Sequence, residues 1–186
     1  MDVQVSKRLF SVEEFHQMAH AGVFREDDRV ELVNGEVVEI RPVGARHASC
    51  VDRLAHAAHV RLESRAIVRV QSPIRLADQS EPQPDLVVLR YRPDFYRDAH
   101  PGPNDILLVV EVADTSAAYD REVKVPLYGR AGIPEVWLID LTAVTIEVYT
   151  HPSRQGYDHL VRLVSGDRLR CKSLADLEVT VSDLLN

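Results

Sequence analysis

One stretch of the chain, residues 107–140, most constrains what this sequence can fold into. It reads LLVVEVADTSAAYDREVKVPLYGRAGIPEVWLID. Two apolar runs, residues 106–110 and 136–139, flank a polar turn and a segment of helical character. Two short apolar strands joined through a helix are typical of a parallel pair that is covered on its faces. The first run ends at Glu111, and a buried strand disfavours a carboxylate unless a metal or a catalytic site requires it.

The helical segment between the two strands carries its own breaks. Pro126 removes one backbone hydrogen bond inside the helix, so the sequence predicts a kink or a split there. Gly132 is placed to end the helix. Lys124 and Tyr128 lie on this segment, and the sequence favours a core position for Tyr128, as it does for Trp137.

The N-terminal part predicts a helix followed by a β-hairpin. Ser11 and Glu14 form a capping-box pattern at the start of a helix that is expected to stop near Gly22. Asn34-Gly35 lies between two β-rich arms, which is the sequence of a type I′ hairpin turn. Glu31 lies on the first arm, and spacing alone favours an exposed strand residue there.

Residues 46–65 predict a second helix, and residues 67–76 predict a strand that contains Gln71. The apolar stripe of the helix is Val51, Leu54, Ala55, Ala58 and Leu62. His47, His56 and His59 match no zinc signature, so the pattern favours surface positions for them.

Further strands are expected on both sides of a long loop. Pro84 starts an apolar strand at residues 86–89, which places Asp85 at the strand entry. Residues 90–105 hold three prolines and one glycine and are the candidate lid or substrate loop.

Toward the C-terminus, residues 145–149 are expected to form a hairpin with residues 136–139. A peripheral β region is expected at residues 157–164, Leu169 and residues 179–181.

Composition predicts one cytoplasmic domain spanning residues 1–186. The chain is 45% hydrophobic and 27% charged, and its N-terminus lacks the apolar core of a signal peptide. No apolar run approaches the roughly 20 residues of a membrane span. Cys50 and Cys171 fit no metal spacing and are expected to be reduced.

The charge distribution points to one basic segment. The net charge of −7 disfavours a protein that coats nucleic acid, but residues 41–75 hold seven arginines and only two acids. This segment could meet phosphates, although charge alone favours a solvated helix face.

Asp85, Glu111 and Lys124 together suggest a metal-dependent hydrolase. Two carboxylates on neighbouring strands can hold Mg²⁺, with water completing the coordination shell. Such an ion activates water and neutralises charge in phosphoryl chemistry, and a nearby ammonium can assist the water or stabilise developing charge. The set therefore suits hydrolysis of a phosphodiester. Lys124 could instead pair with Asp120 one helical turn earlier.

These residues also carry a resemblance to a known family. Pro84-Asp85 and the acid in Val110-Glu111-Val112 resemble the PD-(D/E)xK nuclease superfamily. VVEVADTS, then Asp120 and Lys124, then LYGRAGIPEVWLID, resemble the Uma-type family of putative restriction endonucleases. The lysine expected two residues after Glu111 is replaced by Ala113. In the Uma-type family a lysine from the following helix takes its place, and Lys124 occupies that position.

The resemblance implies a restriction-endonuclease-like α/β fold, with a mixed central sheet, flanking helices, an N-terminal hairpin and a C-terminal β extension. It implies an endonuclease that uses Mg²⁺ or Mn²⁺, with Asp85 and Glu111 as metal ligands and Lys124 as a catalytic residue. Glu31, Gln71 and His47 would surround the metal.

The resemblance implies DNA as the substrate and a homodimer or higher oligomer as the assembly. Two other readings stay open at this point. One is an inactive binding or assembly module on the nuclease fold, and the other is a hydrolase of RNA or of another phosphate ester.

Overall fold

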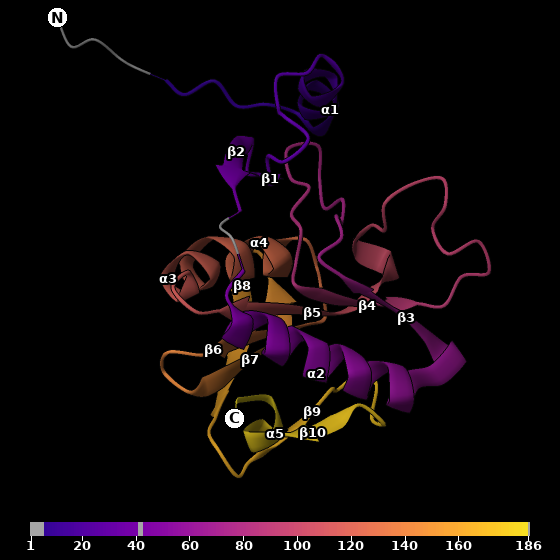
Figure 1. Ribbon diagram of the computed structural model, residues 1–186, viewed down its shortest axis with the longest axis vertical. Coiled ribbons are helices and arrows are strands. Elements are labelled where there is room, and N and C mark those ends of the chain that lie inside the picture. The colour runs from indigo at the N-terminus through magenta and orange to yellow at the C-terminus, as the bar shows by residue number, and fades with distance from the viewer. Residues whose placement is uncertain (1–5, 41–42, 186) are drawn as a thin grey trace, which may run out of the picture.

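The computed structural model describes residues 6–40 and 43–185 (Figure 1). Arg41, the first arginine of the basic segment, lies outside the described residues. The centre of the fold is a six-stranded mixed sheet with the strand order β3-β4-β5-β6-β7-β8. The strands are β3 Ala66–Val70, β4 Leu86–Arg90, β5 Ile106–Ala113, β6 Glu135–Asp140, β7 Thr145–Ser153 and β8 Gly156–Leu163. Within this sheet only β5 and β6 are parallel, which confirms the predicted strand–helix–strand unit.

The crossover between β5 and β6 is a broken helix. It consists of α3 (Ala117–Tyr119), the π-helical turn η3 (Asp120–Lys124) and α4 (Val125–Arg130). Pro126 lies in the first turn of α4, directly after the π-helical turn, so the helix departs from regular α-helical geometry where the sequence predicted an interruption. Gly132 follows the helix with φ of +83°, a conformation that favours glycine.

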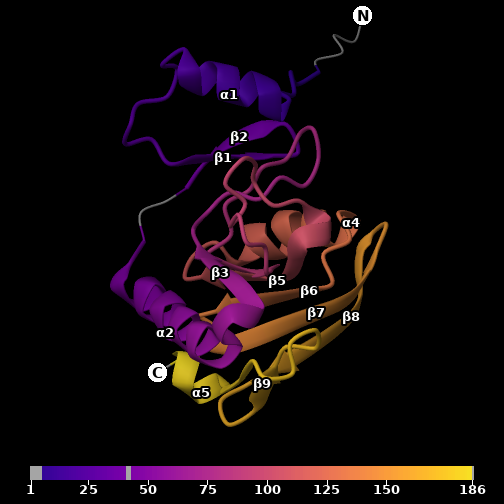
Figure 2. The same ribbon diagram turned by 90° about the vertical axis from the view of Figure 1, so that its right-hand side faces the viewer.

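Both faces of the sheet are covered. Figure 2 shows α2 (Ala45–Leu62) and α5 (Val181–Leu185) on one face and α4 on the other. The short 3-10 turn η1 (Glu63–Arg65) joins α2 to β3, and a two-stranded sheet of β9 (Arg168–Arg170) and β10 (Glu178–Thr180) lies beside α5. The α2 face buries Trp137, and the α4 face buries Tyr128 and Leu138. The fold is therefore the predicted mixed sheet flanked by helices.

The N-terminal helix and hairpin form a smaller unit with its own core. Helix α1 (Val12–His20) begins with the predicted capping box at Ser11. Strands β1 (Val30–Val33) and β2 (Glu36–Glu39) pair across Asn34 and Gly35, which both have positive φ, as a type I′ turn requires. Figure 2 shows this unit beyond the α4 face of the sheet, so the hairpin approaches that face from outside.

Two expectations about strands were wrong in part. The strand expected over residues 67–76 ends at Val70, because Gln71 adopts a left-handed conformation with φ of +45°. Residues 157–164, expected in a separate peripheral β region, largely form β8, which belongs to the central sheet as its edge strand and pairs with β7. Residues 90–105 are irregular as expected, apart from the 3-10 turn η2 (Pro103–Asp105).

Both cysteines are free and buried, as expected. In the part of the chain that the structure describes, no helix is long and apolar enough to cross a membrane.

Candidate active site

Strands β4 and β5 bring Asp85 and Glu111 together. Leu86 pairs with Val110 in antiparallel register, so the next residue on each strand places Asp85 beside Glu111 on one face of the sheet. The backbone N–H of Val112 donates to the Asp85 carboxylate at 2.9 Å. Both acids line a cavity of about 690 Å³. Two carboxylates distant in sequence thus share one hollow.

Lys124 reaches this hollow from the crossover. It ends the π-helical turn, and its Nζ lies 2.8 Å from Glu111 Oε1 and 3.3 Å from Glu31 Oε2. All three side chains are at most 6% exposed. The ammonium is therefore a buried cation shared by two buried carboxylates. The structure describes both Lys124 and Asp120, and the pair that helical spacing allowed between them is not formed. Lys124 pairs with Glu31 and Glu111, and Asp120 accepts a hydrogen bond from Ser116.

Glu31 is not the exposed strand residue that its spacing favours. It is buried on β1, and besides Lys124 it accepts a hydrogen bond from the backbone N–H of Gln83 at 2.8 Å. The hairpin lies over the α4 face of the sheet, so an outward-facing position on β1 becomes an inward-facing position of the cavity. Strand periodicity cannot reveal burial by a segment from elsewhere in the chain.

His47 and Gln71 hold Asp85. His47 Nε2 lies 3.1 Å from Asp85 Oδ2, and Gln71 Nε2 donates to Oδ1 at 3.3 Å. The surface position that spacing favoured for His47 is wrong, since its side chain is only 12% exposed. Burial opposes the charged imidazole, but Asp85 outweighs burial and raises the pKa of His47. Burial likewise opposes the Asp85 carboxylate, and His47 outweighs it and lowers the pKa of Asp85.

Sequence reasoning missed two further residues of this site. Tyr128 donates its hydroxyl to Glu111 Oε1 at 2.5 Å, although its ring lies in the core as expected. Asp120 is 5% exposed and lines the cavity. Asp120 and Tyr128 stand four residues before and after Lys124, on the same face of a helix. That spacing could have identified both.

The cavity concentrates negative charge. Glu31, Asp85, Glu111 and Asp120 all line it, and Lys124 is the buried cation among them. Burial raises the pKa of Glu111 to about 8, against the opposing effect of Lys124, and the other three carboxylates add to the rise. Burial also raises the pKa of Asp120. Such a cavity favours an added cation because a cation relieves the repulsion among the acids.

The donor set fits a hydrated magnesium or manganese ion. Among the described residues, no three His, Cys, Asp or Glu side chains are grouped to hold a metal. Mg²⁺ needs no such group, since it commonly takes one or two carboxylates and keeps several waters. Asp85 accepts three hydrogen bonds, and a carboxylate has about four lone-pair positions, so one is left for an ion. Asp85 and Glu111 can therefore supply two ligands.

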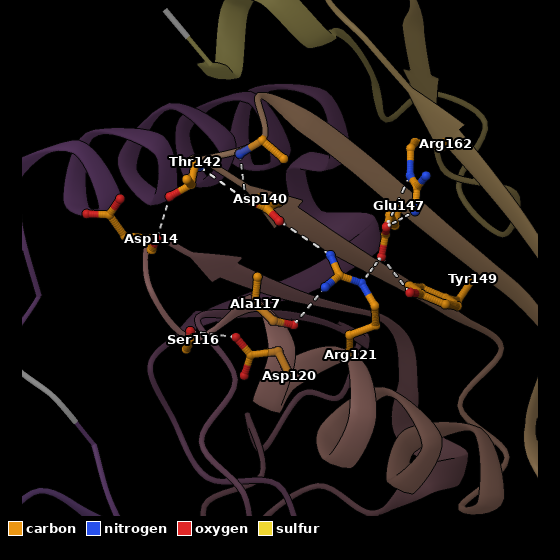
Figure 3. Close-up of polar contacts among 11 residues, drawn as sticks. Asp114, Ser116, Ala117, Asp120, Arg121, Asp140, Thr142, Glu147, Tyr149 and Arg162 are labelled. Carbon is orange, nitrogen blue, oxygen red and sulfur yellow. Dashed lines mark hydrogen bonds and ion pairs between the residues drawn. The ribbon is translucent and has the colours of Figure 1, made fainter.

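A polar network behind the cavity fixes the crossover to the sheet (Figure 3). Arg121 donates to Glu147 on β7 at 2.9 Å and to Asp140 on β6 at 3.3 Å. Glu147 also accepts hydrogen bonds from Arg162 at 2.6 Å and from the Tyr149 hydroxyl at 2.6 Å. Arg121 and Lys124 belong to the same π-helical turn, so this network positions the lysine.

Most of the described basic segment does not face the cavity. Arg46 donates to the Leu141 carbonyl, and Arg53 donates to the Asp183 carbonyl in α5. Arg65 pairs with Asp176. These arginines therefore join α2 and η1 to neighbouring segments.

Comparison with known proteins agrees with this architecture. Residues 12–182 match the sequence profile of the Uma2 family, described as "Putative restriction endonuclease". A solved structure from Anabaena variabilis ATCC 29413, a putative nuclease belonging to DUF820, superposes with a TM-score of 0.74 at 14% sequence identity. The superposition covers 95% of this chain and 97% of that chain, so the two share a fold. No curated protein matches the chain.

Proposed function

Because this chain belongs to the Uma2 family of putative restriction endonucleases, we propose that it is a divalent-metal-dependent DNA endonuclease. The observation that carries the proposal is the meeting of Asp85, Glu111 and Lys124 in one cavity. Distant segments supply these three residues, and two carboxylates that can hold a metal ion beside an ammonium suit metal-dependent hydrolysis of a phosphodiester.

Asp85 and Glu111 would hold Mg²⁺ or Mn²⁺. When bound, such an ion supplies activated water and neutralises charge on the phosphate. His47, Gln71 and the Val112 N–H fix the Asp85 carboxylate in place. Tyr128 and Lys124 both contact Glu111 Oε1, which fixes the orientation of the second carboxylate. Neither ligand would need to reorganise when the substrate arrives.

Lys124 would act through its charge. Its two ion pairs raise its pKa, although burial opposes the charged form, so the side chain carries an ammonium at neutral pH. An ammonium cannot accept a proton from water. It can donate a hydrogen bond to the attacking water or to a phosphate oxygen as negative charge develops there. We assign Lys124 the role of orienting and stabilising, and Glu31 the role of holding Lys124.

In this reaction a water oxygen forms a bond to phosphorus, and one phosphorus–oxygen ester bond breaks. The proton from the water passes to solvent, and the leaving alkoxide takes a proton from solvent. The products are a phosphomonoester and an alcohol.

A cleavage assay on purified protein tests the proposal. Supercoiled plasmid is incubated with Mg²⁺ or Mn²⁺, and the wild type is compared with Asp85→Asn and Glu111→Gln. We expect nicking or linearisation by the wild type only when metal is present, and a loss of at least about a hundredfold in each variant, the scale of one removed electrostatic group in an active site.

Glu135→Gln is the matched control. Glu135 is a buried glutamate on the adjacent strand β6, but it bonds to Trp137 and Lys172 and does not line the cavity. This variant should cleave like the wild type. Cleavage that persists in Asp85→Asn and Glu111→Gln would refute the proposed ligands. Inactive wild type on plasmid, single-stranded DNA and RNA would refute the nuclease proposal.

A further inference from the structure

The loop that follows β4 displays two aromatic rings to solvent. Tyr91 is 47% exposed and Phe95 is 58% exposed. Their rings pack edge to face with centroids 6.0 Å apart. Large aromatic side chains are usually buried, so a pair that is held outward is informative. Figure 1 shows the loop projecting beyond the ends of β3 and β4.

The backbone under these rings is held in an unfavourable conformation. Phe95 and Tyr96 both have positive φ, 51° and 57°, which is rare and unfavourable for bulky residues. A strained backbone conformation persists only where contacts with the surrounding structure stabilise it. Here the Phe95 carbonyl accepts a hydrogen bond from Arg69 at 2.7 Å, and the Tyr96 hydroxyl donates to the Arg90 carbonyl at 2.7 Å. The fold therefore maintains the strain that turns Phe95 outward.

Two guanidinium groups lie against Tyr96, the residue that follows Phe95. Arg92 lies over the Tyr96 ring at 4.5 Å from its centroid, and Arg69 lies at 5.6 Å. Tyr96 itself is buried, and its hydroxyl bonds to the Arg90 carbonyl, so it anchors the loop that carries Tyr91 and Phe95. Arg92 also pairs with Asp94, so both of its contacts hold the guanidinium within the loop that carries the exposed rings.

Arg69 connects this loop to the candidate active site. Arg69 is the penultimate residue of β3 and lies two residues before Gln71, which bonds to Asp85. Gln71 in turn accepts a hydrogen bond from Arg29 at 3.3 Å. Strand β4 runs from Asp85 to the loop, so Tyr91 lies about 20 Å from Asp85 at about 3.4 Å per residue. That span equals about six stacked nucleotides.

We propose that Tyr91 and Phe95 form a stacking platform for an unpaired nucleobase of the substrate strand that enters the cavity. Exposed aromatic faces beside arginines are the chemistry with which proteins bind single-stranded nucleic acid, because every base has a face to stack while guanidinium groups contact the phosphates. The platform rests on the proposed nuclease function and narrows its substrate to nucleic acid with unpaired bases within reach of the site.

Binding without catalysis tests the platform. Fluorescence anisotropy with a labelled 20-nucleotide oligo-dT, in EDTA, compares the wild type with Phe95→Asn. Asparagine tolerates positive φ, so this substitution removes the ring without adding backbone strain. We expect oligo-dT binding to weaken about tenfold or more. An oligomer of the same length made of abasic nucleotides should bind the wild type and the variant alike, because it offers phosphates and no bases.

Val144→Asn is the matched control, because Val144 is an exposed apolar residue with φ of +56° between β6 and β7. It should bind oligo-dT like the wild type. Equal binding of oligo-dT by Phe95→Asn and the wild type would overturn the platform, as would an equal loss on the abasic oligomer or no oligo-dT binding by the wild type. Metal-dependent cleavage of plasmid reports separately on the nuclease proposal. Weakened binding without any cleavage would keep the platform and reject the nuclease.

Discussion

At the scale of single residues, Lys124 controls the balance of charge in the cavity. Replacing it with methionine leaves Glu31 and Glu111 buried without their cation. We expect Lys124→Met to lower the free energy of unfolding at neutral pH by about 3–5 kcal/mol, the usual cost of removing one partner of a buried ion pair. Adding Glu31→Gln should recover part of that loss, because one uncompensated carboxylate is then removed. Urea unfolding of the four members of this double-mutant cycle measures the coupling.

The loss of unfolding free energy in Lys124→Met should depend on pH, and the direction of that dependence can be predicted. Protonation neutralises an unpaired carboxylate, so the deficit of Lys124→Met should be smaller at pH 5 than at pH 8. Lys7→Met is the control, since Lys7 pairs with Glu36 on the exposed surface and should change stability little. A deficit that is independent of pH, or a double variant no more stable than Lys124→Met, would contradict the shared ion pair.

For the residues of the candidate active site, the sequence predicts which side chains take part better than it predicts how buried each side chain is. An acid directly after an apolar run identified Glu111, which the structure places inside β5, and the resemblance supplied Lys124 in place of the missing lysine at Ala113. Spacing alone misplaced Glu31 and His47, because segments that are distant in the chain bury Glu31 and cover most of His47. The roles of these residues in cleavage stay predictions until the variants are assayed.

At the scale of elements, the network at Glu147 joins the crossover to the sheet (Figure 3). Burial disfavours the Glu147 carboxylate, but hydrogen bonds from Arg121, Tyr149 and Arg162 outweigh burial and lower its pKa. A lowered pKa stabilises the fold above the ordinary glutamate pKa near 4.3, and this contribution is lost as pH falls through the folded value. We expect Glu147→Gln to cost about 2 kcal/mol at pH 7, and the difference from wild type to shrink below about pH 4.

Thermal melts across pH measure this effect, with Glu178→Gln as the control. Glu178 pairs with Arg168 at an exposed position, so that variant should melt close to the wild type at every pH. If Glu147→Gln melts like the wild type at pH 7, the network does not fasten the crossover.

Local sequence rules account for most of the elements. The Ser11 capping box, the Asn34-Gly35 turn and the break near Pro126 are each decided by neighbouring residues, and each is confirmed. The strand predicted over residues 67–76 failed at Gln71, where the chain turns so that its amide meets Asp85. Gln71 makes this contact with a residue that directly precedes another strand, and the alternation of apolar residues within residues 67–76 carries no information about such a contact.

At the scale of the whole molecule, the proposed metal site couples to folding. An ion that binds only the folded chain stabilises it by RT ln(1 + [L]/Kd), which is about 2.7 kcal/mol at one hundred times Kd. For a domain of 150–250 residues, each kcal/mol shifts the melting temperature by about 2–4 °C. We therefore expect saturating Mn²⁺ to raise the melting temperature of the wild type by about 5–10 °C, and to raise that of Asp85→Asn and Glu111→Gln much less.

The metal-dependent shift separates ligand binding from catalysis, because it needs no substrate. Glu135→Gln keeps the cavity intact and should show the full shift. A shift of equal size in Asp85→Asn would place the ion elsewhere on the molecule. If the shift is confined to the chains with both carboxylates but no cleavage accompanies it, the fold holds metal without turnover. That result would favour a binding module over the nuclease, since the cavity would then use its charge to bind an ion rather than to cut a phosphodiester.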